Sequence, residues 1–375
     1  MTAPIYMDYN ATAPIRSSVI EMVAAAMQTV GNPSSVHTAG RSARRMVEEA
    51  RTKVAALAGC RSRDVTFCSG GTEASNAVIR GSGAASIIVS AIEHDCGFAA
   101  AKLAGVPSYT LGVSTNGLVD LEQLRSLLAK APAPALVSVM LANNETGTLQ
   151  PVHEIADIAH EFGARVHTDA VQAAGKVPID FSALSADYLT LSSHKIGGPQ
   201  GVGAVITAPT APLAPLIAGG GQELGRRSGT ENVAGIAGFG VAAIEAMDDL
   251  ADSKRIEAMR DRFEAAVSDH ANAVYFIGRE TPRTANTSCV AMPGVKGETQ
   301  VMHFDLNGIC LSSGSACSSG KVKVSHVLSA MGYGDETANA SIRVSLGRLS
   351  TDSDVDTLIA AWKSLYDRTA GRAAP

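Results

Sequence analysis

The chain has 375 residues, 46% of them hydrophobic, and a formal net charge of −5, so it can bury a large core in two domains or in one domain with an appendage. It contains no long basic block and only 4% aromatic residues, which argues against nucleic-acid binding. No apolar run reaches the length of a membrane span and the N-terminus lacks the layout of a signal peptide, so we expect a cytoplasmic protein.

Short apolar runs alternate with helical patterns through the first two-thirds of the chain. The runs predict strands over residues 64–67, 86–91, 135–141, 165–168, 187–191 and 202–207. The patterns between them predict helices over residues 73–79, 121–129 and 155–162. This alternation is typical of an α/β protein with a mostly parallel sheet flanked by helices.

The alternation changes after residue 251. A charged amphipathic helix is predicted over residues 253–268, and short apolar runs follow near Val274, Ser288 and Ile309 and over residues 342–346. These elements indicate a smaller α+β domain. We therefore expect a large domain over residues 14–252 and a small domain made of residues 1–13 and 253–375.

Two residues in this pattern carry the strongest chemical signal. Asp169 ends one apolar run, and Lys195 follows the next. Enzymes that use pyridoxal phosphate (PLP) need such a pair, because the lysine binds the cofactor as a Schiff base and the aspartate pairs with the pyridinium nitrogen. A buried structural ion pair or a solvated strand end is the alternative for either residue alone.

Other polar residues lie where such a cofactor needs them. Gly71 and Thr72 open a predicted helix, where backbone N–H groups bind a phosphate, and Ser192 and His194 could add donors. A plain turn with a helix cap is the alternative. The remaining candidates are His94, for stacking on the ring and moving protons, and Asn144 and Gln172, for the phenolic oxygen. A strand-end histidine and an Asn-Asn turn are their alternatives.

A cysteine and an arginine are candidates for the substrate chemistry. Cys317 lies in a small, polar, glycine-bearing loop that suits a mobile, exposed nucleophilic thiol, whereas the other five cysteines lie in or beside apolar runs. Arg343 could bind a carboxylate bidentately, although single arginines at sheet edges are common. The spacing of His153, His160 and His167 does not favour a zinc site, since no carboxylate pattern completes it.

Together these motifs resemble the PLP-dependent cysteine desulfurases of iron–sulfur cluster assembly, in the first desulfurase group of the class V aminotransferase family. The resemblance covers nearly the whole chain. It is carried by the strings at residues 8–12, 31–37, 93–95, 143–145, 169–172, 191–199, 227–230, 313–317 and 342–347.

The resemblance implies PLP fold type I with a seven-stranded sheet, and a homodimer in which Thr230 reaches the phosphate bound by the other subunit. It implies that L-cysteine becomes L-alanine with a persulfide left on Cys317, which Lys195 and His94 assist by moving protons. The substrate-binding residues that we expect are Asn10, Thr12, Asn32, Asn144 and Arg343.

The sulfur would then pass to a scaffold protein of iron–sulfur assembly or to another acceptor. Cys317 could briefly ligate a nascent cluster at that interface, which is the one metal contact that we expect. A selenocysteine lyase or a PLP-dependent aminotransferase would use the same lysine and aspartate, so both remain alternatives. The sequence leaves the physiological acceptor open.

Overall fold

The computed structural model describes residues 4–313 and 324–370. Its largest sheet contains β2 (Val65–Cys68), β3 (Ser86–Ser90), β4 (Ser108–Leu111), β5 (Ala135–Ser138), β6 (Arg165–Asp169), β7 (Tyr188–Ser192) and β8 (Gly203–Thr207). The strand order is β2-β8-β7-β6-β5-β3-β4. β8 is antiparallel to both neighbours, and the other neighbouring strands are parallel. The predicted mostly parallel, seven-stranded sheet is therefore confirmed.

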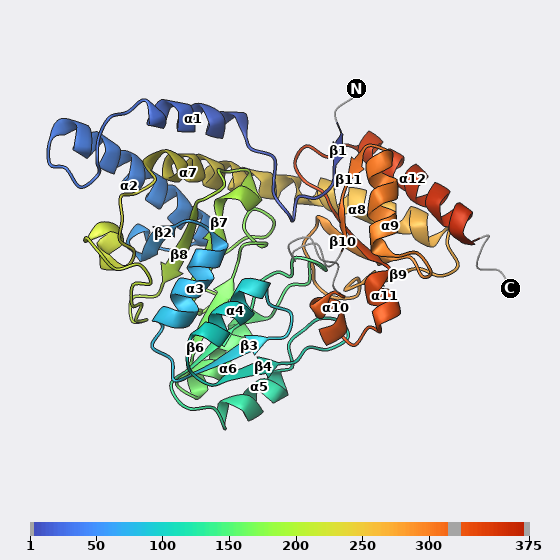
Figure 1. Cartoon of the computed structure of the whole chain (residues 1–375), viewed down its shortest axis with the longest axis horizontal. Coiled ribbons are helices and arrows are strands. Elements are labelled where there is room, and N and C mark those ends of the chain that lie inside the picture. Colours follow the sequence, from blue (N-terminus) through green and yellow to red (C-terminus); the bar gives the residue numbers. More distant parts are fainter. Residues whose placement is uncertain (1–3, 314–323, 371–375) are drawn as a thin grey trace.

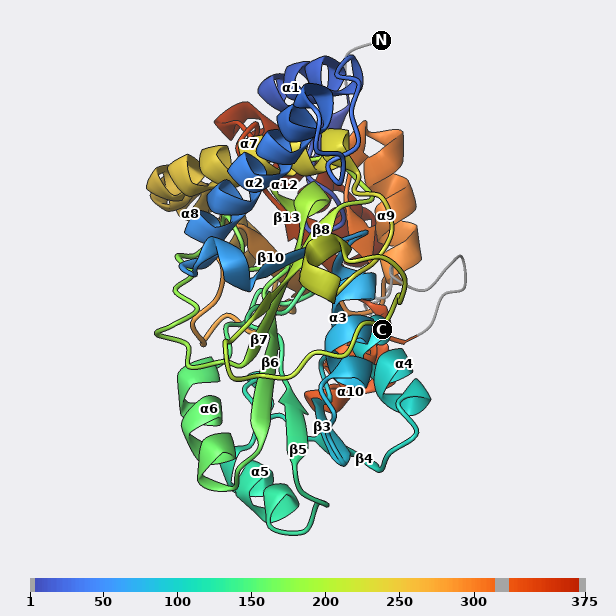
Figure 2. The same ribbon diagram turned by 90° about the vertical axis from the view of Figure 1, so that its left-hand side faces the viewer.

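Helices cover both faces of this sheet, as Figure 2 shows. One face carries α3 (Gly71–Gly81) and α4 (Asp95–Leu103), and the other carries α5 (Leu121–Leu128) and α6 (Val152–Glu161). Three further helices lie together in Figure 1, namely α1 (Ser17–Met27), α2 (Thr38–Ala58) and α7 (Val233–Asp248). Helix α7 packs closely on α2, because a Cβ at Gly240 would lie 2.7 Å from the Cα of Ala50.

The C-terminal part forms a second layered unit. Its four-stranded antiparallel sheet contains β9 (Tyr275–Ile277), β10 (Thr287–Ala291), β12 (Ser312–Ser313) and β13 (Ser341–Ser345). Its helices are α8 (Ser253–Ser268), α9 (Gly297–Leu306), α10 (His326–Ala330), α11 (Asp335–Asn339) and α12 (Asp352–Ala370). The predicted helix over residues 253–268 is thus present with those bounds, and the runs near Ser288 and over residues 342–346 fall on strands.

The N-terminal segment joins this second unit. β1 (Ile5–Tyr6) pairs in parallel with β11 (Ile309–Cys310), and Figure 1 shows it among the C-terminal elements. Met7 is buried in the hydrophobic core that contains Trp362, whereas a separate core lies against the seven-stranded sheet. Two separate cores support the domain bounds 14–252 and 1–13 with 253–375, which stay a prediction.

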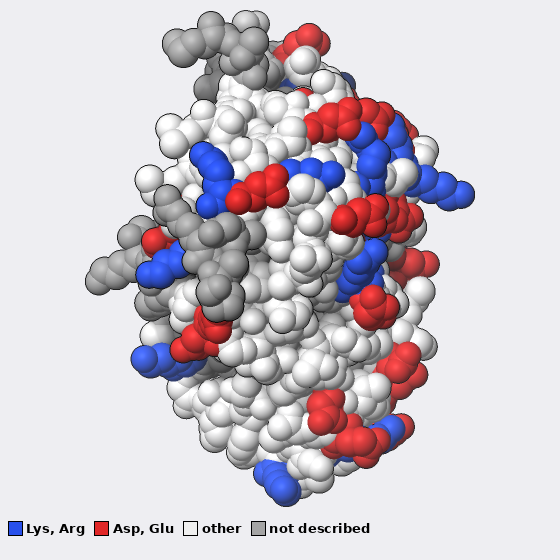
Figure 3. Space-filling model, turned by 90° about the vertical axis from the view of Figure 1, so that its right-hand side faces the viewer, with Lys and Arg blue, Asp and Glu red and all other residues white. Residues whose placement is uncertain are grey.

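The surface carries charges of both signs. Figure 3 shows Lys and Arg side chains interspersed with Asp and Glu side chains on one face of the molecule. Among these charges, Arg262 forms ion pairs with Asp352 and Asp356. Within residues 4–313 and 324–370, no helix combines the length and the apolar character that crossing a membrane requires.

The sheet brings the two chemically informative strand ends together. β6 and β7 are parallel neighbours, with Asp169 opposite Thr190. β7 runs on into a 3₁₀ turn, Ser193–Ile196, which contains Lys195. Because parallel strands end at the same edge of a sheet, Asp169 and Lys195 meet at the carboxyl edge, where α/β proteins bind ligands.

Candidate active site

A cavity of about 250 Å³ opens at this carboxyl edge. Side chains from β6, β7, the start of α3 and the loops after β3 and β5 meet around it. Its lining residues are Gly71, Thr72, His94, Cys96, Met140, Ala142, Asn144, Asp169, Val171, Gln172, Ser192, His194 and Lys195. With the exception of Thr230, all of the residues predicted to bind the cofactor therefore line one cavity.

Asp169 forms the acidic end of the cavity. Its side chain is only 8% exposed, and its Oδ1 accepts a hydrogen bond of 2.9 Å from the backbone N–H of Val171. Burial raises the pKa of Asp169, while the hydrogen bond from Val171 and the nearby His94 and Lys195 oppose that rise. A buried carboxylate is stable when it has a cationic or N–H partner, and the protonated nitrogen of a pyridine ring is such a partner.

Lys195 is held by the N-terminal segment of the chain. Its Nζ donates hydrogen bonds to the backbone oxygens of Asn10, at 2.6 Å, and Ala11, at 2.7 Å. Gly197 follows with a φ of +80°, which ends the 3₁₀ turn directly after the lysine. The short turn therefore keeps the amino group at the strand end, where it lines the cavity.

The start of α3 suits a phosphate. Gly70 precedes this helix with a φ of +152°, and its first residues, Gly71 and Thr72, line the cavity, where the unpaired backbone N–H groups of a helix start favour an anion. β8 lies directly beneath this turn, because a Cβ at Gly203 would lie 2.6 Å from the Cα of Gly70. Burial lowers the pKa of His194 to about 4, aided by the charge of Lys195, so its ring is neutral at pH 7.

His94 and Cys96 form the side of the cavity. His94 caps α4, since its Nδ1 accepts a hydrogen bond of 3.3 Å from the backbone N–H of Cys96. An accepting Nδ1 leaves the proton of a neutral ring on Nε2. Cys96 Sγ lies 3.0 Å from the same nitrogen, and burial raises the pKa of this thiol to about 12. The sequence had indicated an ordinary buried cysteine here, and its place in the cavity was not predicted.

Asn144 and Gln172 reach the cavity from two loops. The loop with Asn144 is shaped by Asn143, whose Oδ1 accepts the backbone N–H groups of Glu145 and Thr146 at 2.8 and 2.9 Å. The predicted Asn-Asn turn is therefore present, and it places the second asparagine in the cavity. Gln172 donates from Nε2 to the backbone oxygen of Asn10 at 2.8 Å.

Arg343 lies on β13 and is only 2% exposed. Its Nη1 donates to the backbone oxygen of Asn144 at 3.1 Å, and its Nη2 donates to Asp8 Oδ1 at 2.6 Å. Its Nε is buried without any hydrogen-bond partner. A buried donor without a partner is costly in a folded protein, and the carboxylate of a bound amino acid would satisfy it.

Asn10, Thr12 and Arg343 do not line this cavity, but each is hydrogen-bonded to a residue that does, namely Gln172, His194 and Asn144 respectively. The other three predicted residues have no such link among the residues that the structure describes. Thr230 and Asn32 are exposed on loops of their own, and neither lines the cavity. The loop of Thr230 is tied to the start of α3 by an ion pair of 2.9 Å between Arg227 and Glu73. Cys317 lies outside the described residues.

The donor set fits PLP. The cavity lining combines a buried carboxylate (Asp169), the first residues of a helix (Gly71 and Thr72) and a lysine (Lys195), which suit the pyridine nitrogen, the phosphate and the aldehyde of this cofactor. A metal centre has no comparable support, since the described residues contain no group of three or more His, Cys, Asp or Glu side chains that could hold an ion.

Comparisons with known proteins agree with this geometry. The family model of class-V aminotransferases matches residues 5–358. A cysteine desulfurase IscS from Dictyoglomus turgidum is 41% identical over 371 residues, covering 95% of this chain and 93% of that protein.

Solved structures are similar as well. The X-ray structure of a NifS-like protein from Rickettsia africae has a TM-score of 0.89 at 38% identity, covering 97% of this chain and 99% of that one. A structure of SspA in complex with cysteine has a TM-score of 0.78 at 28% identity, covering 91% and 98%. The resemblance predicted from the motifs is confirmed: the chain belongs to the class-V aminotransferase family, among its PLP-dependent cysteine desulfurases.

Proposed function

We propose that this chain removes the sulfur of L-cysteine at the cavity between Asp169 and Arg343 and holds it as a persulfide on Cys317. The observation that carries this proposal is the unpaired Nε of Arg343, a buried donor close to the cofactor residues, because Nη1 of the same guanidinium binds Asn144. The cysteine bound in the structure of the similar SspA also supports L-cysteine as substrate.

The cofactor would be oriented by its two ends. Bound PLP supplies a protonated ring that withdraws electrons from the substrate Cα. Asp169 accepts the N–H of that ring and keeps it protonated, and Lys195 binds the cofactor covalently. The phosphate is bound by Gly71, Thr72, Ser192, His194 and Thr230 of a second copy of the chain, the ring face by His94, and the phenolic oxygen by Asn144 and Gln172.

The substrate would be oriented by its carboxylate. Arg343 would bind this group through Nε and the remaining guanidinium hydrogens, and Asn10, Thr12, Asn32 and Asn144 are the other residues proposed to bind the substrate. The amino group of Lys195 would take the Cα proton. Since Nδ1 of His94 is occupied by the cap of α4, its Nε2 is the ring nitrogen left to exchange a proton near the substrate sulfur.

The sulfur step balances without an added oxidant. The thiolate of Cys317 attacks the substrate sulfur, an S–S bond forms and the C–S bond breaks, so that L-cysteine and one thiol become L-alanine and one persulfide. This chemistry requires access to the cavity and then to an acceptor, which suits the polar loop around Cys317.

The partners and the location belong to the same proposal. We infer a cytoplasmic homodimer that passes sulfur to an iron–sulfur scaffold protein or to another acceptor. Cys317 would then be the one residue that transiently ligates iron at that interface. Thr230 lies outside the cavity of its own chain, which supports the proposal that it contacts the phosphate of a second copy.

The test measures alanine and sulfide formed from L-cysteine by wild type, Cys317→Ser and the control Cys60→Ser. Cys60 is a partly buried cysteine that does not line the cavity. Cys317→Ser should lose nearly all alanine formation but keep the change in cofactor absorbance on adding L-cysteine, whereas Cys60→Ser should behave as wild type. Alanine release by Cys317→Ser at the wild-type rate would refute the proposal and favour an aminotransferase or another lyase.

A further inference from the structure

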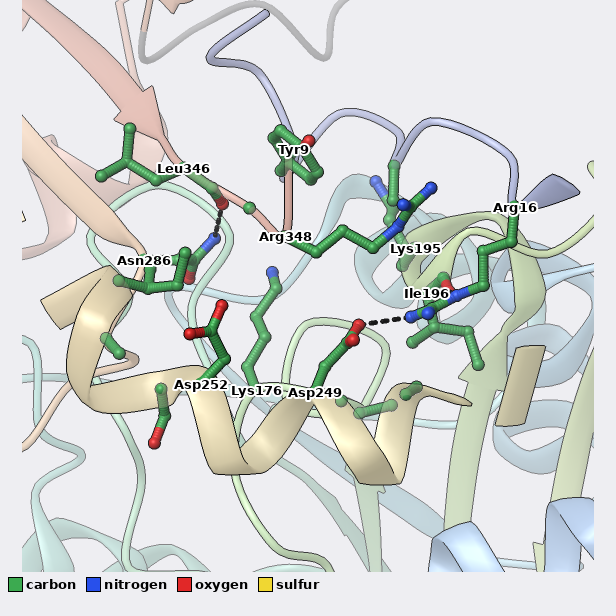
Figure 4. A pocket seen from close by; sticks show the side chains of 18 residues that line it. Tyr9, Arg16, Lys176, Lys195, Ile196, Asp249, Asp252, Asn286, Leu346 and Arg348 are labelled. Atoms are coloured by element: carbon green, nitrogen blue, oxygen red, sulfur yellow. Dashed lines mark hydrogen bonds and ion pairs between the residues drawn. The ribbon is translucent and has the colours of Figure 1, made fainter. Parts of the chain in front are cut away.

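A second cavity, of about 80 Å³, lies behind Lys195 at the junction of the two cores. Lys195 lines both cavities, whereas Lys176 lines only the second. Figure 4 shows the Lys176 side chain projecting into this space, surrounded by Tyr9, Asn286 and Arg348. The chemistry proposed above uses Lys195 and gives no role to this second lysine.

Lys176 holds two residues of the site at once. Its Nζ donates to Gln172 Oε1 at 2.6 Å and to Asn10 Oδ1 at 2.7 Å. The turn after β6 makes this possible. Gly175 adopts a φ of +70° in this turn, and Lys176 lies next to Gln172, four positions earlier in the chain. Burial lowers the pKa of Lys176 well below its usual range, as do the charges of Lys195 and Arg343. A neutral amine still has the two hydrogens that these contacts use.

The contact with Lys176 fixes the orientation of the Gln172 amide. Its Oε1 accepts from Lys176, and one hydrogen of its Nε2 is donated to the backbone oxygen of Asn10. A flipped amide would place oxygen against oxygen at Asn10 and nitrogen against nitrogen at Lys176. The second hydrogen of Nε2 is left for the cofactor cavity, which Gln172 lines.

Asn10 is fixed by the same lysine. Its Oδ1 accepts from Lys176 and, at 3.0 Å, from Asn286 Nδ2. Its backbone oxygen accepts from Lys195 and from Gln172. Lys176 therefore connects Asn10, which holds Lys195, to Gln172, which is proposed to face the phenolic oxygen.

We propose that Lys176 is a positioning residue, which presents Gln172 as an N–H donor to the phenolic oxygen of PLP and steadies Asn10 beneath Lys195. The inference rests on the proposed role of Gln172 at that oxygen. A donor at a phenolic oxygen favours its ionised form, so the loss of Lys176 should move the pH at which the absorbance of the bound cofactor changes to higher values.

The experiment compares Lys176→Met with wild type and with Lys130→Met, an exposed lysine after α5 that does not line either cavity. The loss of one oriented hydrogen bond should weaken PLP binding by the apoprotein about 3- to 10-fold and raise the midpoint of the absorbance change by about 0.5–1 pH unit. Lys130→Met should change neither quantity. If circular dichroism shows that Lys176→Met is unfolded, Lys176→Gln, which keeps an N–H donor, is measured instead and should raise the midpoint by less than about 0.5 pH unit.

A double-mutant cycle with Gln172→Leu separates this inference from the proposed function. If Lys176 acts through Gln172, the double variant should have the midpoint of Gln172→Leu alone. Two results would overturn the inference and leave the proposed function standing. In the first, the midpoint shifts of the two single variants add in the double variant. In the second, Gln172→Leu shifts the midpoint but the Lys176 variant keeps the wild-type value. A wild-type midpoint in Gln172→Leu would overturn the role of Gln172 itself, and the inference with it.

Discussion

The cofactor end and the substrate end of the cavity are built differently. Asp169 and Lys195 follow neighbouring parallel strands of one sheet, whose backbone ladder fixes their separation. Arg343 lies on a strand of the other sheet and reaches the site through two hydrogen bonds, to Asn144 and Asp8. The comparison indicates that the backbone positions of Asp169 and Lys195 depend on one core, whereas the position of Arg343 in the site depends on how the two cores meet.

The largest expected effect lies at the cofactor end. Lys195→Ala should lower alanine formation by about 10³-fold or more, because both covalent cofactor binding and proton transfer at Cα are lost. Borohydride followed by mass spectrometry should locate the cofactor on Lys195 in the wild type. Lys176→Met is the matched control, since it should keep the reduced adduct on Lys195. An adduct on Lys176 in the wild type would contradict the assignment.

Removing the acidic partner should be the next most damaging change. Asp169→Ala should fold but bind PLP weakly, because breaking a buried charged pair typically costs roughly 3–5 kcal/mol. Equilibrium dialysis of PLP and the turnover of L-cysteine measure this loss. Asp187→Ala, a partly exposed aspartate that pairs with His160, serves as control and should keep normal affinity. Near-normal turnover in Asp169→Ala would show that the pyridine nitrogen has another partner.

Arg343→Ala should separate the two ends of the cavity. We expect KM for L-cysteine to rise about 10- to 100-fold, because a hydrogen bond to a charged group usually contributes about 1.5–3 kcal/mol. PLP affinity should change little, because the hydrogen bond from Arg343 to Asn144 goes to the backbone oxygen and not to the side chain proposed to hold the cofactor. The reverse result, with loss of cofactor and an unchanged KM, would refute the comparison.

The smallest effect concerns the contact between the two cores at Glu145, whose Oε2 accepts from Ser325 Oγ at 2.6 Å. Burial raises the pKa of Glu145 to about 7, although Ser325 and Arg343 oppose the rise. Between about pH 4.5 and 7 the folded protein therefore holds a proton that the unfolded chain has lost, so stability should fall as pH rises through this window.

Glu145→Gln removes that dependence. As pH increases from 5 to 8, its thermal midpoint should rise relative to that of the wild type. The difference should correspond to about 1–2 kcal/mol in the free energy of unfolding. The exposed Glu122→Gln on α5 should show no such gain. Parallel pH profiles for wild type and Glu145→Gln would mean that this carboxyl titrates normally.

The sequence predicted for a physical reason that Asp169 and Lys195 would come together. Asp169 and Lys195 follow consecutive apolar runs, and parallel strands bring their ends to one edge whatever the details of packing. Lys176 and Cys96 were not predicted, because their places depend on the turn after β6 and on the cap of α4 rather than on a strand pattern. β4 was missed as well, since only Leu111 of this short edge strand is buried.

The substrate end was predictable only through the family resemblance. Arg343 on its own resembles any arginine in a strand, and its ties to Asp8 and Asn144 join residues far apart in the chain. The roles given to all of the site residues stay predictions, including those of Thr230, Asn32 and Cys317. Thr230 and Asn32 lie away from the cavity of their own chain, and Cys317 lies outside the described residues.

The N-terminal segment has a consequence for the order in which the protein is made. β1 pairs with β11, and the backbone N–H of Asn10 donates to Ser345 Oγ at 3.0 Å. The first residues to leave the ribosome therefore cannot form these contacts until residues more than 300 positions later have been synthesised. The seven-stranded sheet, complete by Thr207, can form earlier. A nascent chain is thus expected to expose Lys195 without its Asn10 support until β13 has emerged, so productive cofactor capture is a late event of synthesis.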